Sequence, residues 1–116
     1  MKYFTLDEFN CPSLPNSGKN MDSSFLAKLE EARGIAGVPF KITSGYRTKE
    51  HNAEVGGVPN SSHLIGVAAD IAVSNGSERY IILNALIRAG FKRIGVAKTF
   101  IHCDTDPNKS NSVWTY

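Results

Sequence analysis

The chain has 116 residues, a formal net charge of +2, and 41% hydrophobic against 21% charged residues. This length and composition predict one domain, residues 1–116, that is monomeric around a single core, and they exclude a disordered chain. No apolar run approaches the ~18 residues that cross a bilayer, and the basic residues are scattered, so we expect no membrane span and no nucleic-acid partner.

The first half of the chain predicts two helices and a strand. Residues 5–8, TLDE, have the pattern of a capping box, so a short helix begins there. The proline-containing residues 11–20 predict a loop. Apolar residues recur at helical spacing over residues 22–36. Residues 40–43 alternate like a half-buried strand, which places Arg47 just past a strand end.

The second half predicts one helix and several strands. Residues 49–55 favour one or two helical turns, and residues 59–62 are expected to be irregular. Residues 67–73, VAADIAV, are typical of a buried strand, and a helix capped by Ser77 should extend to Arg88. Three further short strands are expected at residues 93–97, 99–104 and 113–116. Short strands with short connections favour an α+β fold with a small, mostly antiparallel sheet.

The N-terminus and the cysteines bear on the cellular compartment. Residues 1–8, MKYFTLDE, place two acids where the core of a secretory signal is apolar, so we expect no signal peptide and synthesis in the cytoplasm. Two cysteines are far fewer than a disulfide framework needs. We expect Cys11 and Cys103 to be free and buried rather than bridged.

Three polar residues mark candidate metal chemistry. Asp70 interrupts an apolar strand, where an ionised carboxylate is costly unless a positive group binds it. His63 stands seven residues earlier, and His102 interrupts another apolar segment. Two imidazoles and one carboxylate form a ligand set of catalytic zinc sites, which leave one position to water. The ordinary alternative stays open, because buried charges pair more often than they coordinate.

Strand alternation adds a geometric expectation. Asp70 shares its face with two alanines, which leave room above the carboxylate for an ion and a substrate. His102 shares a face with Asp104, while Ile101 and Cys103 should point into the core. Two strands can then converge on one metal ion. The third histidine, His51, lies in a polar stretch and is expected on a solvated helix face.

Three blocks of the sequence resemble a known family. SGYR at residues 44–47, SxHxxGxAxD at 61–70 and HxD at 102–104 are similar, in this order, to the signature blocks of the zinc D-alanyl-D-alanine carboxypeptidases, relatives of lysostaphin-type enzymes and of the hedgehog signalling domain. The resemblance implies helices packed on one side of the sheet and a zinc peptidase acting on peptidoglycan stem peptides. It implies His63, Asp70 and His102 as metal ligands.

The resemblance also suggests roles for residues around the metal. Arg47 matches the family's substrate-binding arginine, whose guanidinium suits a terminal carboxylate or an oxyanion. The alternative is a surface arginine paired with an acid. Ser62 either orients the substrate or merely ends its loop. His51 gains a weaker role as an acid or a substrate contact.

The general base is the point where the chain departs from the family. Several branches carry Glu three residues before the last ligand, whereas this chain has Thr99. The HxD form supplies Asp104 instead. This carboxylate either takes a proton from water or accepts the second ring N–H of a ligand imidazole, and we favour the second role.

Two functions from different classes are consistent with these residues. The first is a zinc peptidase cutting bonds next to D-amino acids, either a D-Ala-D-Ala carboxypeptidase or a murein endopeptidase. Its expected setting is a phage endolysin or virion protein acting in the periplasm or cell wall. The second is a non-catalytic zinc- or peptide-binding module of the same fold, which the absence of Glu at position 99 supports.

Overall fold

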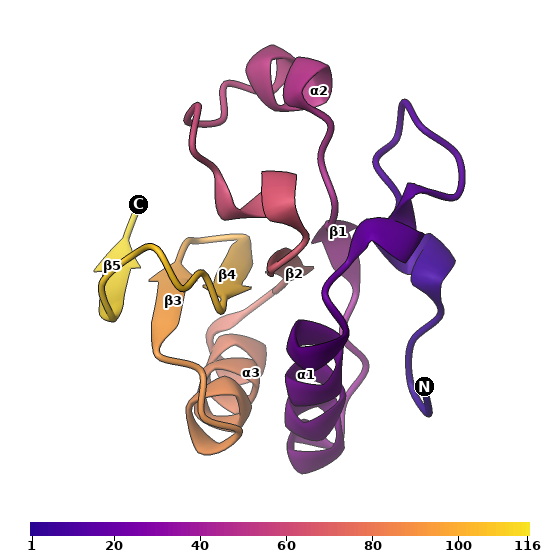
Figure 1. The fold of residues 1–116 in the computed structure, drawn as a ribbon. Helices are drawn as coiled ribbons and strands as arrows, with labels where there is room; N and C mark the ends of the chain where they lie inside the picture. Colours follow the sequence, from indigo (N-terminus) through magenta and orange to yellow (C-terminus); the bar gives the residue numbers. More distant parts are fainter.

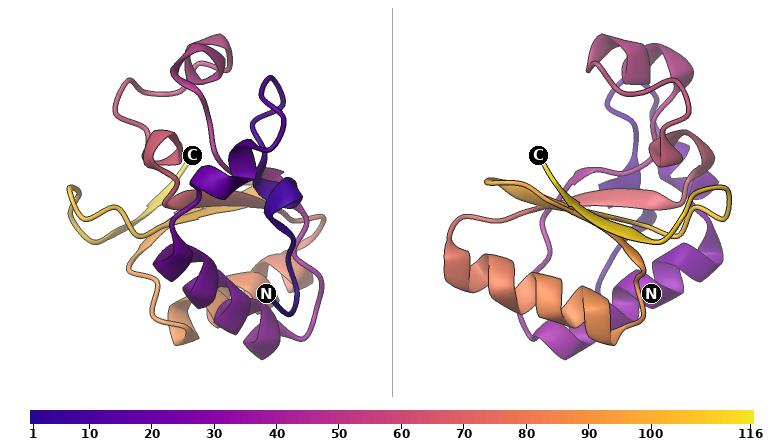
Figure 2. Two further views of the ribbon diagram at one scale, coloured as in Figure 1. Left: turned by 45° about the vertical axis from the view of Figure 1, so that its right-hand side comes forward. Right: turned by 90° about the vertical axis from the view of Figure 1, so that its left-hand side faces the viewer.

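A five-stranded sheet separates a helical side of the molecule from the side that carries the candidate site. The computed structural model describes residues 1–116 (Figure 1). Figure 2 shows the two long helices side by side against one face of the sheet, with the short α2 beyond the opposite face. The helices are α1 (Ser23–Ala36), α2 (Lys49–Glu54) and α3 (Gly76–Arg88), with 3-10 turns η1 (Leu6–Phe9), η2 (Ser17–Asn20) and η3 (Ser62–Ile65). The strands are β1 (Ile42–Ser44), β2 (Ala68–Ala72), β3 (Arg93–Val96), β4 (Phe100–Asp104) and β5 (Ser112–Thr115).

The sheet has the strand order β1-β2-β4-β3-β5. Strands β1, β2, β4 and β3 pair with their neighbours in antiparallel fashion. After β4 the chain reverses and passes β3 to reach its outer edge, so β5 runs parallel to β3 with Trp114 opposite Gly95. The expected α+β fold with a small, mostly antiparallel sheet is confirmed, and the parallel edge strand is an addition to it.

The register of β2 and β4 decides where the site forms. Asp70 lies directly opposite His102 in this ladder. Because successive side chains on a strand point to opposite faces, Ile71 and Ile101 turn toward the helices and are fully buried, as is Cys103. Asp70 and His102 therefore lie together on the other face, as the alternation predicted.

The ends of the helices follow from capping residues. The Asp22 carboxylate accepts the N–H of Phe25 at the start of α1, and Gly37 ends this helix with a φ of 67°. The expected Ser77 cap on α3 is wrong. Asn75 caps this helix instead by accepting the N–H of Glu78, because asparagine is an equally strong cap and stands two residues earlier.

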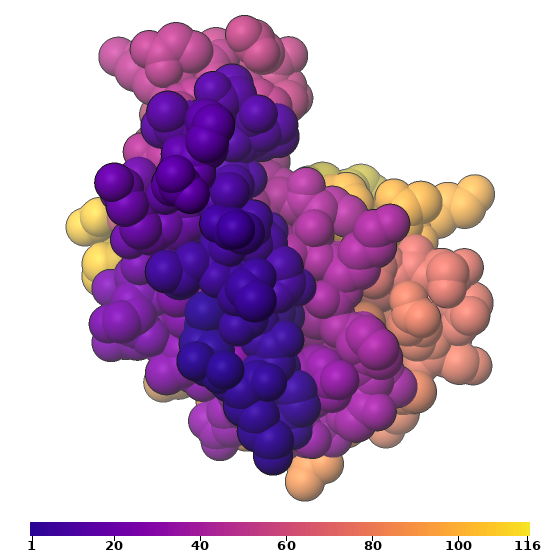
Figure 3. All heavy atoms as spheres, turned by 90° about the vertical axis from the view of Figure 1, so that its right-hand side faces the viewer, coloured from indigo at the N-terminus to yellow at the C-terminus, as the bar shows by residue number.

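The N-terminal segment lies along the outside of α1, as Figure 3 shows. The helix expected after Thr5 is the 3-10 turn η1. Before it, the Glu30 carboxylate of α1 accepts the N–H of Tyr3 at 2.9 Å. After it, the carbonyl of Phe9 accepts the N–H of Tyr46 at 2.9 Å. The segment thus braces the residues that lead to Arg47.

Smaller expectations have mixed outcomes. Cys11 and Cys103 are free and buried, as expected. Residues 17–20, expected in a loop, form η2, and η3 begins at Ser62, the last residue of an expected irregular stretch. A single 3-10 turn is short and leaves little sequence signal. None of the helices combines the length and apolarity needed to cross a membrane.

Candidate metal centre

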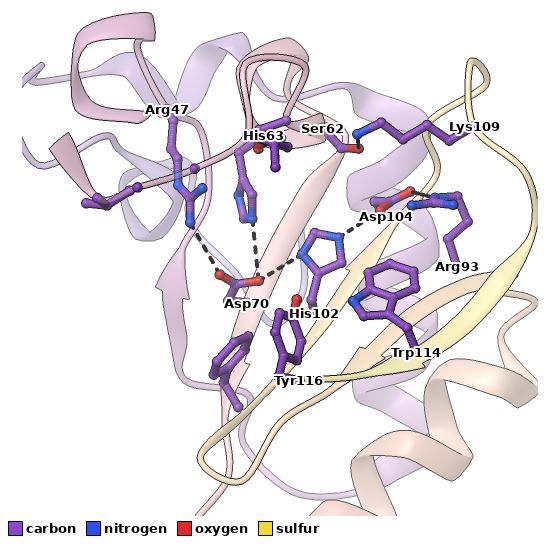
Figure 4. A pocket seen from close by; sticks show the side chains of 16 residues that line it. Arg47, Ser62, His63, Asp70, Arg93, His102, Asp104, Lys109, Trp114 and Tyr116 are labelled. Carbon is purple, nitrogen blue, oxygen red and sulfur yellow. Dashed lines mark hydrogen bonds and ion pairs between the residues drawn. The ribbon is translucent and has the colours of Figure 1, made fainter. Parts of the chain in front are cut away.

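Three side chains expected to bind metal converge above the sheet. His63 comes from η3, Asp70 from β2 and His102 from β4 (Figure 4). One donor atom from each lies within 4.8 Å of the others. Asp70 Oδ1 is 2.9 Å from His102 Nδ1 and 3.4 Å from His63 Nε2. Tetrahedral zinc with bonds of ~2.0–2.1 Å holds its donors roughly 3.3 Å apart, so the two distances from Asp70 fit the ion.

His63 is oriented by the SGYR block. Its Nδ1 lies 2.7 Å from the carbonyl oxygen of Gly45, which only accepts, so Nδ1 carries the proton and Nε2 presents its lone pair to the centre. A Cβ at residue 45 would lie 2.7 Å from the Cα of Phe9. Glycine at this position therefore allows the close backbone approach that holds the imidazole in place.

His102 is oriented by Asp104. Its Nε2 donates to Asp104 Oδ2 at 2.7 Å, which leaves Nδ1 facing Asp70. The other oxygen of Asp104 accepts from Arg93 Nε at 2.8 Å and from the N–H of Asp106 at 3.1 Å. Both oxygens of this buried carboxylate are thus engaged. The arrangement is that of a carboxylate holding a ligand imidazole in one tautomer.

The charges of the cluster favour a cation at its centre. Burial acts to raise the pKa of Asp70, but hydrogen bonds with His102 and His63 outweigh it and lower the pKa well below its usual range. Burial acts to lower the pKa of His102, but hydrogen bonds to Asp104 and Asp70 outweigh it and raise the pKa. Two carboxylates around one imidazole stabilise positive charge, which a metal ion supplies as well as a proton does.

The donors face a cavity of about 410 Å³. Arg47 and residues 55–58 line it together with Phe100, Trp114 and Tyr116. Figure 4 shows Arg47 on one side of the cluster and the two C-terminal aromatic side chains on another. The cavity is large enough to admit part of a peptide beside the donor atoms.

Arg47 is held by three protein groups at the cavity wall. Its Nε donates to Ser44 Oγ at 3.1 Å and its Nη1 to Asn52 Oδ1 at 3.2 Å, while Nη2 is 3.6 Å from Asp70 Oδ2. The side chain is only 15% exposed. A Cβ at residue 57 would lie 2.0 Å from Asn52 Oδ1, so Gly57 makes room for this bond. The acid that pairs with the arginine is a candidate metal ligand itself.

Ser62 lines the cavity, and its hydroxyl is used within the protein. It donates to Asp106 Oδ2 at 2.7 Å and accepts from Lys109 Nζ at 3.0 Å. These bonds tie η3 to the loop that follows β4. A positioning role is therefore visible for Ser62, while its substrate contact stays a prediction.

His51 is not brought to the cavity. It lies on α2 with its Nδ1 3.9 Å from Glu54 Oε2, and it is not among the lining residues. It lies on a helix as expected, but with its side chain only 18% exposed it is less solvated than the expected helix-face residue. This placement lends no support to a substrate contact.

The sequence analysis did not assign four polar or aromatic lining residues near the C-terminal strands to the site, namely Arg93, Lys109, Trp114 and Tyr116. The spacing of the two aromatic residues is a signal for one shared strand face. Arg93 is recognisable only once β3 is paired with β4, because its Cα partner in that ladder is Asp104. Long-range register of this kind has no local sequence pattern.

Comparison with known proteins bears on identity. A search of curated proteins finds no match to the chain. The model of one family, described as Peptidase M15, matches residues 2–104. This stretch includes His63, Asp70, His102 and Asp104. Since it covers most of the chain, this protein belongs to the Peptidase M15 family.

Proposed function

We propose that this protein is a zinc-dependent peptidase that hydrolyses peptide bonds next to D-amino acids in peptidoglycan stem peptides. One observation carries the proposal: His63, Asp70 and His102 each bring one donor atom within 4.8 Å of the others, beside an open cavity. In both imidazoles the remaining nitrogen is held by a protein acceptor. Membership of a peptidase family supports the same activity.

The residues would divide the work as follows. His63, Asp70 and His102 would hold zinc, which when bound supplies a Lewis acid that activates water and polarises the scissile carbonyl. Asp104 keeps His102 in the tautomer that offers Nδ1. The outward N–H groups of Arg47 would bind a substrate carboxylate or the oxyanion that forms on the carbonyl.

The shape of the site favours internal cleavage over trimming of a chain end. A second cleft of about 300 Å³ shares Arg93, Asp104 and Lys109 with the metal cavity. We propose that the substrate peptide extends from the metal site toward this second cleft, as an endopeptidase requires and a carboxypeptidase does not. An enzyme of this kind would act on wall peptides in the periplasm or cell wall, as a phage endolysin or virion protein does.

The test is digestion of purified peptidoglycan by the zinc-loaded protein, with muropeptides read by mass spectrometry. We expect crosslinked dimers to disappear, the activity to stop with a chelator, and zinc to restore it. Loss of single D-alanine residues instead would identify a carboxypeptidase. Asp70→Asn, which removes one ligand charge at nearly constant size, should lose both zinc and activity.

A non-catalytic module of the same fold gives a different result. Such a protein binds one equivalent of zinc and leaves every muropeptide intact. The engagement of both oxygens of Asp104, which leaves no free carboxylate base on this residue, is the observation in its favour. Intact muropeptides at full zinc occupancy would therefore refute the peptidase proposal.

A further inference from the structure

The C-terminal residues place two aromatic side chains against the metal site. Trp114 lies on β5, and Tyr116 follows directly after its end on the same face. The Trp114 ring is 5.5 Å from the ring of His102. The Tyr116 ring packs on Phe100 of β4, with 5.0 Å between centroids. Figure 4 shows the Tyr116 hydroxyl pointing toward Asp70 and His102.

The position of the indole depends on a glycine. A Cβ at residue 95 would lie 2.5 Å from Trp114 Nε1, so Gly95 opposite it on β3 allows the ring to lie against the sheet. The guanidinium of Arg93 covers the indole, with its Cζ 4.9 Å from the ring centroid. The aromatic wall is thus fixed by the strand beside it.

The phenol of Tyr116 adds an uncharged hydrogen-bond donor to the cavity, beside the N–H groups of Arg47. Arg47 donates to Ser44 and Asn52, and Lys109 donates to Ser62. The hydroxyl of Tyr116 makes no hydrogen bond within the protein, so its proton is free for a bound group.

The phenol also keeps its proton at neutral pH. The residue is 70% exposed as a whole, but partial desolvation on the cavity side, followed by the charges of Asp70 and Asp104, raises the pKa of Tyr116. The nearby indole of Trp114 and the charge of Arg47 act in the opposite direction but do not reverse the shift. The side chain therefore serves as a donor, not as a base.

We propose that Tyr116 is a catalytic residue whose hydroxyl donates a hydrogen bond to the oxyanion that develops on the scissile carbonyl. The proton stays on the phenol throughout, so no bond of the tyrosine breaks. This inference rests on the proposed peptidase function. Tyr116 and Trp114 both lie beyond residues 2–104 that match the family, so this structure alone assigns the role.

The test compares two tyrosine-to-phenylalanine variants of the zinc-loaded protein. Tyr116→Phe keeps the ring on Phe100 and removes the donor. Tyr80→Phe is the control, because Tyr80 on α3 is 68% exposed against 70% for Tyr116 and lies outside the cavity lining. Readouts are kcat and KM on a defined muropeptide, bound zinc, and calorimetric affinity for a phosphinate peptide that mimics the tetrahedral geometry.

We expect kcat of Tyr116→Phe to fall about 10- to 100-fold, with KM and zinc content unchanged. A buried oxyanion donor contributes about 10²- to 10³-fold, and the exposure of Tyr116 reduces its share. Phosphinate affinity should fall by a similar factor, and Tyr80→Phe should match the wild type.

Other outcomes overturn the inference separately from the proposed function. An unchanged kcat, or a rise in KM alone, would show that the phenol does not stabilise the transition state. If the wild-type protein cleaves nothing at full zinc occupancy, the peptidase proposal fails. The phosphinate measurement needs no turnover, so equal affinity of wild type and Tyr116→Phe still rejects the role of Tyr116.

Discussion

Replacing Asp104 by asparagine separates an imidazole-orienting carboxylate from a general base. The carboxylate accepts three hydrogen bonds, from His102 Nε2, Arg93 Nε and the N–H of Asp106. An amide keeps the size but has only one oxygen. If its NH₂ faces His102, Nε2 must become the acceptor, and the ring proton moves to Nδ1, the atom that points to the metal centre.

The hydrogen bonds of Asp104 determine how much zinc affinity and stability the Asp104→Asn variant should lose. Removing a partner that orients a metal-bound imidazole typically weakens metal binding about 10- to 100-fold. The amide oxygen that then faces Arg93 still accepts its hydrogen bond but carries no charge, and a charged hydrogen bond exceeds a neutral one by about 1 kcal/mol, so the unfolding free energy should fall by about that amount. We therefore expect Asp104→Asn to bind zinc about 10- to 100-fold more weakly and to unfold at a lower temperature than wild type.

The assay is competition for zinc between the protein and a chelator of known affinity. Trp114 is the only tryptophan in the chain and lies 5.5 Å from His102, so its fluorescence reports occupancy. Asp106→Asn is the matched control, because this buried carboxylate contacts Ser62 and Lys109 but not His102. Wild-type zinc affinity combined with abolished turnover in Asp104→Asn would refute our reasoning and identify Asp104 as the base.

Three further predictions follow from the same structure. Zinc at ~1,000 times its Kd contributes about 4 kcal/mol of stability, so the melting temperature should rise by roughly 10 °C or more; calorimetry showing no shift contradicts the metal site. Gly57→Ala places a Cβ 2.0 Å from Asn52 Oδ1 and should break the hydrogen bond from Arg47 to Asn52. The KM should then rise about tenfold or more, with zinc affinity unchanged. An unchanged KM would show that Arg47 does not bind the substrate. Gly95→Ala should displace Trp114 and shift its emission to longer wavelength, with kcat lowered about tenfold, whereas an unshifted spectrum would show that the indole does not need the glycine.

Local patterns were sufficient for most of the fold. The alternation around Asp70 and His102 placed both side chains on one strand face, because the period of a strand depends only on neighbouring residues. The helical spacing over residues 22–36 was equally local, and α1 covers Ser23–Ala36. The error at Ser77 arose between two good capping residues, Asn75 and Ser77, that stand two positions apart.

The features that could not be predicted from the sequence depend on long-range strand pairing. Donor types suggested a metal site, but only the register that sets Asp70 against His102 brings their donors to 2.9 Å. The same holds for Arg93, which becomes a partner of Asp104 through the β3–β4 ladder. The parallel placement of β5, and with it the aromatic wall, depends on how residues 105–111 reverse the chain, and no periodicity encodes that path.

The side chains of β4 alternate between the apolar core and the cavity, and this alternation explains how a small domain holds the site residues in place. Along this strand, Ile101 and Cys103 are fully buried against the helical side, while His102 and Asp104 alternate with them on the cavity side. A shift of the strand by one residue would expose the first pair and bury the second pair's charges in the core. The apolar core therefore stabilises the register, and the register brings His102 to Asp70.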